Sequence, residues 1–243
     1  MLVGIGLAAT GCRPDTVRLA YRPRAGDHTR YRVVVRTITK RTLPGLPDDV
    51  ADDTARLTAR QTVLAVTGGV ARVRVVLSRP GGPDRTLVVR FDRSGALLAV
   101  DSIEGLPASA LGRLGLPEVF PGAGVAPGTP LRPGQRWHAG RSRGRLVELG
   151  IEHHRHVARV TSHTELPASA RAPTADGGTI DISGTEITDA TATRGVDTGV
   201  VERSTSTTTA RFALRIEPPP GQTGPAVDGT LAVTVGTEVT RLF

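Results

Sequence analysis

Cysteine, aromatic residues and lysine are scarce in this chain of 243 residues. Its only cysteine is Cys12, so the chain can form neither an internal disulfide nor a cysteine-based zinc site. It has one Trp, two Tyr and four Phe, and none of these rings is interleaved with basic clusters as in surfaces that stack nucleic-acid bases. Because no nucleic-acid-reader motif is present either, we expect no nucleic acid partner.

An apolar run long enough to cross a bilayer is missing from the N-terminus. Residues Leu2–Ala9 are eight uncharged, apolar residues, which suits the h-region of a signal peptide and is far below the 20 or so that a transmembrane helix needs. Small residues then lead into Cys12. This stretch, LAATGC, resembles the lipobox of bacterial lipoproteins, in which a signal peptidase cuts before the cysteine and the sulfur carries a diacylglyceryl group.

The lipobox resemblance implies how the N-terminus is organised. Residues 1–11 would be removed as a signal peptide, residues 12–20 would form a tether lipidated at Cys12, and the protein would be extracytoplasmic and anchored to the cell membrane as a lipoprotein. Two acyl chains give firm anchoring, whereas one gives only marginal binding. The alternative is that residues 1–12 form an ordinary apolar first strand with a buried thiol.

The charge is unbalanced towards arginine. The chain carries 31 basic and 23 acidic residues, for a net charge of +8, and Lys40 is the only lysine. The density of arginine from Arg13 to Arg41 would attract anionic lipid headgroups to an anchored protein, by about 1 kcal/mol for each basic residue near the surface. The alternative is genome bias, because Arg, Ala, Gly and Pro all have codons rich in G and C.

Alternation with period two is frequent and helical periodicity is scarce, which predicts β-strands. The alternation is clearest in RYRVVVRTITK, ARVRVVL, RTLVVRFD and ARFALRIE. One face of each stretch is apolar and the other polar, as in an antiparallel sheet with one solvated face. We therefore predict a mostly β fold, a curved antiparallel sheet or open half-barrel of hairpins with one or two short helices.

Turn residues predict where the strands are joined. Gly68 and Gly69 in VTGGVA are a two-residue hairpin signal, because both positions tolerate positive φ. Residues Asp92–Gly95 predict a second hairpin. Residues Pro107–Gly115 are the best helix candidate, and PDDVADDTARL (47–57) predicts a helical turn or an acidic loop.

The domain organisation follows from one segment rich in Pro and Gly. Residues 117–134 can scarcely form a central strand, so we interpret them as a crossover loop between two halves of one sheet system. Residues 21–243 are then a single antiparallel β domain.

The order of these features is similar to a family of uncharacterised, β-rich bacterial envelope lipoproteins, a domain-of-unknown-function family. The resemblance covers roughly residues 21–243. It is carried by RAGDHTRYRVVV, FDRSGALLAV, LRPGQRW and TRGVDTGVVERSTSTTTARFALRI. The layout also looks like the LolA-type half-barrel, which implies a curved sheet that holds acyl chains on its concave side.

Motifs for catalysis are weak. GRSRG matches the G-x-S-x-G nucleophile elbow with Ser142 at its centre, but that elbow needs a buried strand before the serine, a helix after it and a later histidine. Here the serine lies between arginines, and no histidine follows His163. We interpret the match as chance or a tight turn, and we expect no enzyme activity and no cofactor.

Four of the six histidines lie in IEHHRHVARVTSH. If this stretch is one strand, Glu152, His154 and His156 project on one face and could ligate zinc or copper. No further ligand is identifiable, so we favour a solvated hairpin end with uncommitted histidines. The acidic PDDVADD stretch lacks the ligand alternation of a calcium loop and is interpreted as a solvated turn.

Two functions of different classes remain. In the first, the protein is non-enzymatic and holds a lipid or other apolar ligand in a concave sheet. The residues expected to share this concave, ligand-binding face are Val33, Val35, Val73, Val75, Leu87, Val89, Phe91, Phe212 and Leu214. In the second, it is a tethered scaffold or protein-interaction module with a filled core and no ligand, and its partner is another envelope protein.

Overall fold

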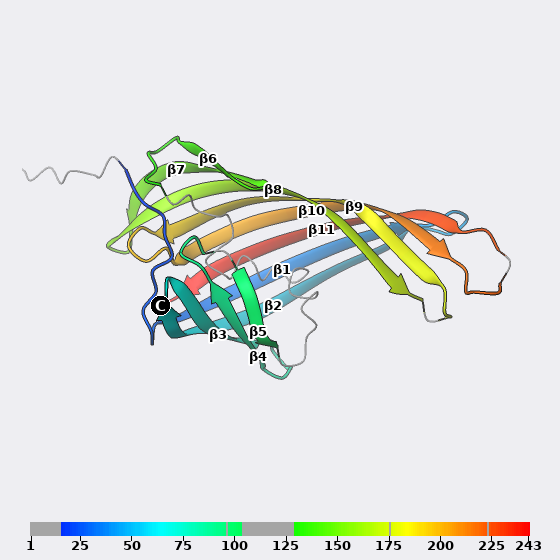
Figure 1. Cartoon of the computed structure of the whole chain (residues 1–243), viewed down its shortest axis with the longest axis horizontal. Helices are drawn as coiled ribbons and strands as arrows, with labels where there is room; N and C mark the ends of the chain where they lie inside the picture. Colours follow the sequence, from blue (N-terminus) through cyan, green and yellow to red (C-terminus); the bar gives the residue numbers. More distant parts are fainter. Residues whose placement is uncertain (1–15, 96, 104–128, 175, 223) are drawn as a thin grey trace, which may run out of the picture.

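The computed structural model describes residues 16–95, 97–103, 129–174, 176–222 and 224–243. This part of the chain contains 11 strands in one sheet and no helix (Figure 1). The strands are β1 (His28–Thr42), β2 (Asp49–Thr67), β3 (Val70–Ser78), β4 (Arg85–Phe91), β5 (Leu97–Ile103), β6 (Arg136–Ala139), β7 (Ser142–Glu152), β8 (Arg155–Pro173), β9 (Thr179–Gly195), β10 (Val201–Glu217) and β11 (Val227–Leu242).

The strand order is β5-β4-β3-β2-β1-β11-β10-β9-β8-β7-β6, and the strand pairs within it are antiparallel. The first and last strands are therefore neighbours at the centre, while β5 and β6 lie at opposite edges. The sheet curves strongly and remains open, as Figure 1 shows. The predicted fold class is confirmed. The helix candidate at residues 107–115, and residues 117–128 of the expected crossover loop, lie outside the described residues.

Both predicted hairpins form. Gly68 and Gly69 join β2 to β3 with φ values of 59° and 84°, the left-handed backbone that a two-residue turn of this kind requires. In the second hairpin, the amide of Gly95 donates to the carbonyl of Asp92 (3.0 Å).

The interpretation of residues 47–57 as a helical turn or acidic loop was wrong, because β2 begins at Asp49. Three of the four carboxylates of this segment, those of Asp48, Asp49 and Asp52, are paired with basic side chains of the neighbouring strand β1. Arg36 donates to Asp52 through two nitrogens (3.0 and 2.6 Å), and Arg41 donates to Asp49 (2.8 Å). Cross-strand pairs of opposite charge stabilise a sheet, so acidic residues are tolerated in this strand.

The larger core cluster lies where β3, β4 and β5 curl under the central strands. The inward side chains of β1–β4 fill this space together with Tyr21. Its buried residues are Tyr21, Tyr31, Val33, Val35, Ala59, Val63, Ala71, Val73, Val75, Leu77, Leu87, Val89, Phe91, Val201 and Val239. We call this end of the sheet the proximal end, and the face that carries the core the inner face.

A smaller cluster forms on the inner face of β7, β8 and β9. Its buried residues are Val17, Leu19, Leu131, Trp137, Leu146, Ala158, Val160 and Ala192. The two clusters are bridged by residues 16–27, which we call the N-terminal strap. The strap contributes Val17 and Leu19 to one cluster and Tyr21 to the other, so the chain is already packed into the domain within the segment expected to be a tether (12–20).

Backbone hydrogen bonds fix the strap across the open side of the sheet. Val17 exchanges two bonds with Leu131 (both 2.8 Å), and the amide of Tyr21 donates to the carbonyl of Arg93 (2.8 Å). The next amide donates to Thr198 (2.8 Å). The strap therefore connects both sides of the curved sheet at its proximal end.

At the other end, six strands continue beyond β3 and β7 as a projection that we call the distal extension (Figure 1). It consists of residues 38–42, 49–52, 165–173, 179–187, 209–217 and 227–234. Neither core cluster includes a residue of the extension. Within the described residues, substantial contacts between strands occur only between sheet neighbours, so no second layer of strands covers it.

Candidate ligand-binding face

The residues expected to bind an apolar ligand all lie on the inner face of the sheet, but in two different places. All of them except Phe212 and Leu214 belong to the larger core cluster and are at most 3% exposed. They contact one another and the strap rather than solvent. Phe212 and Leu214 lie on β10 in the distal extension, whose inner face is not covered by another strand of the described residues.

Pairing registers identify the neighbours of Phe212 and Leu214 on that face. Phe212 is opposite Leu231 of β11, and Leu214 is opposite Ile182 of β9. Side chains on one face of a strand recur every second residue, so the pairing registers identify all the apolar residues on this face of β8 to β11. We call it the inner distal face; it consists of Leu166, Ala168, Ala170, Ala172, Ile180, Ile182, Ala210, Phe212, Leu214, Ile216, Val227, Leu231 and Val233.

This face is only partly shielded from water. Leu166 is 44% exposed and Val227 40% exposed, whereas Leu214 is 6% exposed. Phe212 and Leu231 are half-buried. With strands about 4.8 Å apart and residues about 3.3 Å apart, four strands give an apolar footprint of roughly 500 Å². Apolar patches of this size on a monomer are commonly binding surfaces.

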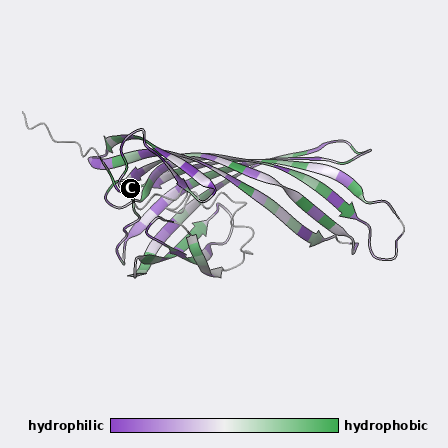
Figure 2. Ribbon diagram, turned by 45° about the horizontal axis from the view of Figure 1, so that its top comes forward, coloured by the Kyte–Doolittle hydropathy of each residue, from purple (hydrophilic) through white to green (hydrophobic). Residues whose placement is uncertain are grey.

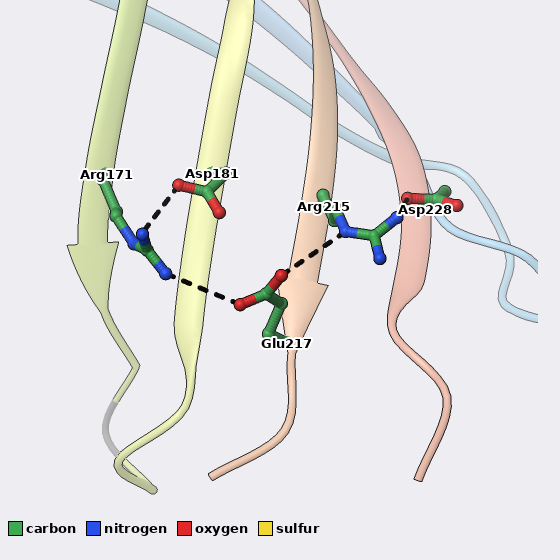
Figure 3. A network of polar contacts seen from close by, with 5 residues as sticks. All are labelled: Arg171, Asp181, Arg215, Glu217 and Asp228. Carbon is green, nitrogen blue, oxygen red and sulfur yellow. Dashed lines mark hydrogen bonds and ion pairs between the residues drawn. The ribbon is translucent and has the colours of Figure 1, made fainter. Parts of the chain in front are cut away.

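The outer face of the extension is charged. Arg171 contacts Asp181 (3.4 Å) and Glu217 (3.5 Å), and Arg215 contacts Glu217 and Asp228 (both 3.5 Å) (Figure 3). Figure 2 shows the same alternation as hydrophilic and hydrophobic bands along the strands. The extension is therefore an amphipathic sheet whose outer side suits water and whose inner side does not.

Polar side chains bound the apolar area. Glu186 lies on the inner face between Leu166 and Ala210, and the ion pair between Arg41 and Asp49 lies on the side of β1 and β2. An apolar molecule would consequently lie along β8 to β11 rather than across the whole width of the extension.

The free edges of the extension are unsuited to pairing with another strand. On β8, the edge segment 165–173 contains Pro167 and Pro173, which lack a backbone donor. On β2, the edge segment 49–52 contains Asp49 and Asp52. Prolines and charges on edge strands discourage edge-to-edge association. The edges of this end are therefore protected against strand addition, while its inner face stays open.

A polar hollow of about 360 Å³ lies at the proximal end, between the strap and the ends of several strands. In its wall, Arg241 donates to Glu202 (2.7 Å), and their side chains are only 17% and 10% exposed. Burial raises the pKa of Tyr21, with a smaller contribution from Asp27, and burial also raises the pKa of Tyr31. Both phenols therefore stay protonated near neutral pH and provide no catalytic base.

The weak catalytic motif has no matching geometry. Ser142 is the first residue of β7, and its hydroxyl shares a hydrogen bond with that of Thr164 (2.8 Å). His163 pairs with Arg143, so it lies on the opposite face from Ser142. His163 instead contacts Asp189 (2.8 Å). A nucleophile and its base must be within hydrogen-bond reach, so these two residues do not form such a pair.

The histidine stretch is not one strand. His153 and His154 have φ values of 48° and 61° and form the turn between β7 and β8, with Glu152 paired to Arg155 on either side. The turn removes the alternation that would have placed Glu152, His154 and His156 on one face. Among the described residues, no three His, Cys, Asp or Glu side chains gather as a metal-binding group.

Comparisons with known proteins identify no family to which the chain is similar. No family model matches the sequence, and no curated protein is significantly similar to it. In the described part of the chain, no helix is long and apolar enough to cross a membrane.

Several members of the inner distal face were missed at the sequence level. Ile180 and Ile182 alternate in TIDI, and Leu231 and Val233 alternate in TLAVTV, so the period-two signal was present. What the sequence does not show is that these strands extend beyond the core, because that depends on where β3 and β7 end.

Proposed function

We propose that this protein is a non-enzymatic, lipid-anchored envelope protein that holds a lipid or other elongated apolar ligand on the inner distal face. The supporting observation is an apolar, solvent-accessible area on the inner side of a sheet whose outer side is charged. A sheet with one apolar face gains stability when a second layer covers that face. An acyl chain lying along β8 to β11 supplies such a layer and needs no hydrogen-bond partners.

The proposed site shares only Phe212 and Leu214 with the set of residues expected on sequence grounds. At the curled proximal end, the strap and the core side chains cover the other expected residues, which are at most 3% exposed. The proposed binding surface lies in the distal extension, towards the ends of the strands. There Phe212 and Leu214 lie beside the isoleucines of β9 and the leucine of β11.

One observation favours a second candidate function, that of a tethered protein-interaction module with a filled core. The inner distal face is open, whereas small-molecule sites usually enclose most of the ligand surface. Another protein could supply the missing layer as well as a lipid could.

Native mass spectrometry of protein released gently from its own cell envelope separates these two functions. A ligand holder is expected to carry an additional mass of lipid size that is lost in a Phe212→Asp variant and kept in an Ala213→Asp variant. Ala213 is the next residue of β10, is exposed and faces outward, which makes it a matched control. A ligand-free protein that carries an envelope protein in a Phe212-dependent way would instead support the interaction module.

The anchor at Cys12 has its own test. We expect the wild-type protein, expressed from its natural start, to fractionate with membranes and to incorporate labelled fatty acid. Cys12→Ser should release the protein or leave the precursor uncut. A wild-type protein that is soluble and unlabelled would contradict the anchor without affecting the inner distal face.

A further inference from the structure

The outer face of β1, β2 and β3 carries five exposed arginines close together: Arg30, Arg32, Arg56, Arg60 and Arg74. We call this set the arginine cluster. Arg30 and Arg60 are direct partners in the β1–β2 register. Directly opposite residues have Cβ atoms about 5 Å apart and diagonal ones about 7–8 Å.

The register makes Arg60 the centre of the cluster. Arg32 is opposite Thr58, two residues from Arg60, and is therefore diagonal to it. Arg60 is itself opposite Val76 on β3, which makes Arg74 diagonal to it on the other side. Arg56 extends the cluster along β2, diagonal to Arg32.

The cluster is poorly neutralised by the protein. Its one ion pair in the described part of the chain joins Arg60 to Asp84 (2.9 Å). By contrast, the neighbouring Arg36 on the same face is paired with Asp52. Like charges directly opposite one another destabilise a sheet, so the Arg30–Arg60 pair has a cost that a bound anion would relieve.

We propose that the arginine cluster docks onto the anionic phosphate headgroups of a lipid bilayer. Guanidinium groups bind phosphate through several parallel hydrogen bonds. Membranes rich in anionic lipid attract each nearby basic residue by about 1 kcal/mol. No aromatic side chain lies in the cluster to stack bases, which disfavours single-stranded nucleic acid as the partner.

This inference goes beyond the proposed ligand and is independent of it, because the cluster lies on the opposite face of the sheet from the inner distal face. Its biological relevance depends on the proposed membrane location. It also specifies which part of the arginine-rich N-terminal region contacts lipid, namely the outward side chains of β1.

The test is co-sedimentation of residues 12–243 carrying Cys12→Ser, which retain every described residue and lack the acylation site. The vesicles are phosphatidylcholine alone or phosphatidylcholine with about a third phosphatidylglycerol. We expect binding only with phosphatidylglycerol, and we expect high salt to weaken it because mobile ions screen surface charges.

Two triple variants with equal loss of charge distinguish a defined surface from general basicity. Arg30→Gln/Arg32→Gln/Arg74→Gln is expected to weaken partitioning at least about tenfold. Arg132→Gln/Arg143→Gln/Arg211→Gln removes three exposed arginines from other parts of the chain and is expected to retain most of the binding. Thermal unfolding checks that both variants fold.

Either of two results would overturn the proposal. One is a parent protein that does not bind vesicles containing phosphatidylglycerol. The other is an equal loss of binding in the two triple variants, which would assign the attraction to net charge alone. Neither result bears on the lipid mass expected for the inner distal face.

Discussion

Tyr21 packs edge-on against Phe91, with ring centroids 6.0 Å apart and ring planes at 87°. Tyr21 belongs to the strap and Phe91 ends β4, so this contact closes the curled end of the sheet. Edge-to-face pairs contribute beyond the burial of their area. The contact joins the strap to the larger core cluster on the proximal inner face.

Removal of this ring should destabilise the whole fold. Tyr21 is 7% exposed, and Tyr21→Ala is expected to lower the free energy of unfolding by about 3 kcal/mol or more, as for other large aromatic truncations in cores. Denaturant unfolding measures the loss. Leu46→Ala, at a loop residue that is 62% exposed, is the control and should change stability by less than about 0.5 kcal/mol. A small effect of Tyr21→Ala would mean that the strap is not part of the core.

The contact between Gly144 and Trp137 gives a second prediction. A Cβ atom on Gly144 would overlap the indole ring of Trp137, which lies on the neighbouring strand. Gly144→Ala is therefore expected to cost about 1–3 kcal/mol and to change the fluorescence of Trp137, the only tryptophan.

Gly150 is the matched control on the same strand. A Cβ atom there would meet its nearest neighbour, Val157, at an ordinary 3.8 Å. Gly150→Ala should alter stability by less than about 1 kcal/mol and leave the tryptophan emission unchanged. Equal effects of the two substitutions would contradict the described packing of Trp137.

The ion pair between Arg36 on β1 and Asp52 on β2 predicts a contribution to stability that depends on pH. Hydrogen bonds from Arg36 lower the pKa of the Asp52 carboxyl. A lowered pKa in the folded state contributes stability above the pKa of the unfolded chain, and this contribution is lost as pH falls through the folded value. NMR titration of the carboxyl carbon should show that Arg36→Gln raises the pKa of Asp52 towards its ordinary value. An unchanged titration would contradict the ion pair.

Local alternation was sufficient to predict β1, β3, β4 and β10, and paired glycines were sufficient to predict the β2–β3 hairpin. The first part of β2 was missed because its acidic residues are stabilised by Arg36 and Arg41 on another strand, which a local pattern does not reveal. The strap has an alternating pattern at Val17, Leu19 and Tyr21. Its backbone partners are scattered over four distant segments, at Val63, Arg93, Leu131 and Thr198, so the pattern alone could not place it.

The candidate site was only partly predictable for the same reason. Phe212 and Leu214 were correctly placed on the inner face by their spacing. Whether an inner-face residue is buried or accessible depends on which strands end early. Val33 and Val89 are covered because β3 and β4 curl beneath β1, and no local signal marks that curl.

The most direct test of the proposed function is a titration of residues 12–243 carrying Cys12→Ser with a fluorescent fatty acid. The matched substitutions are Leu231→Asp on the inner distal face and Ala232→Asp, the next residue of β11, on the outer face. We predict saturable binding by the parent and by Ala232→Asp, and binding weakened at least about tenfold by Leu231→Asp, because burying an unpaired carboxylate against an acyl chain is costly. No saturable binding by the parent, or equal losses in the two folded variants, would contradict a ligand on this face.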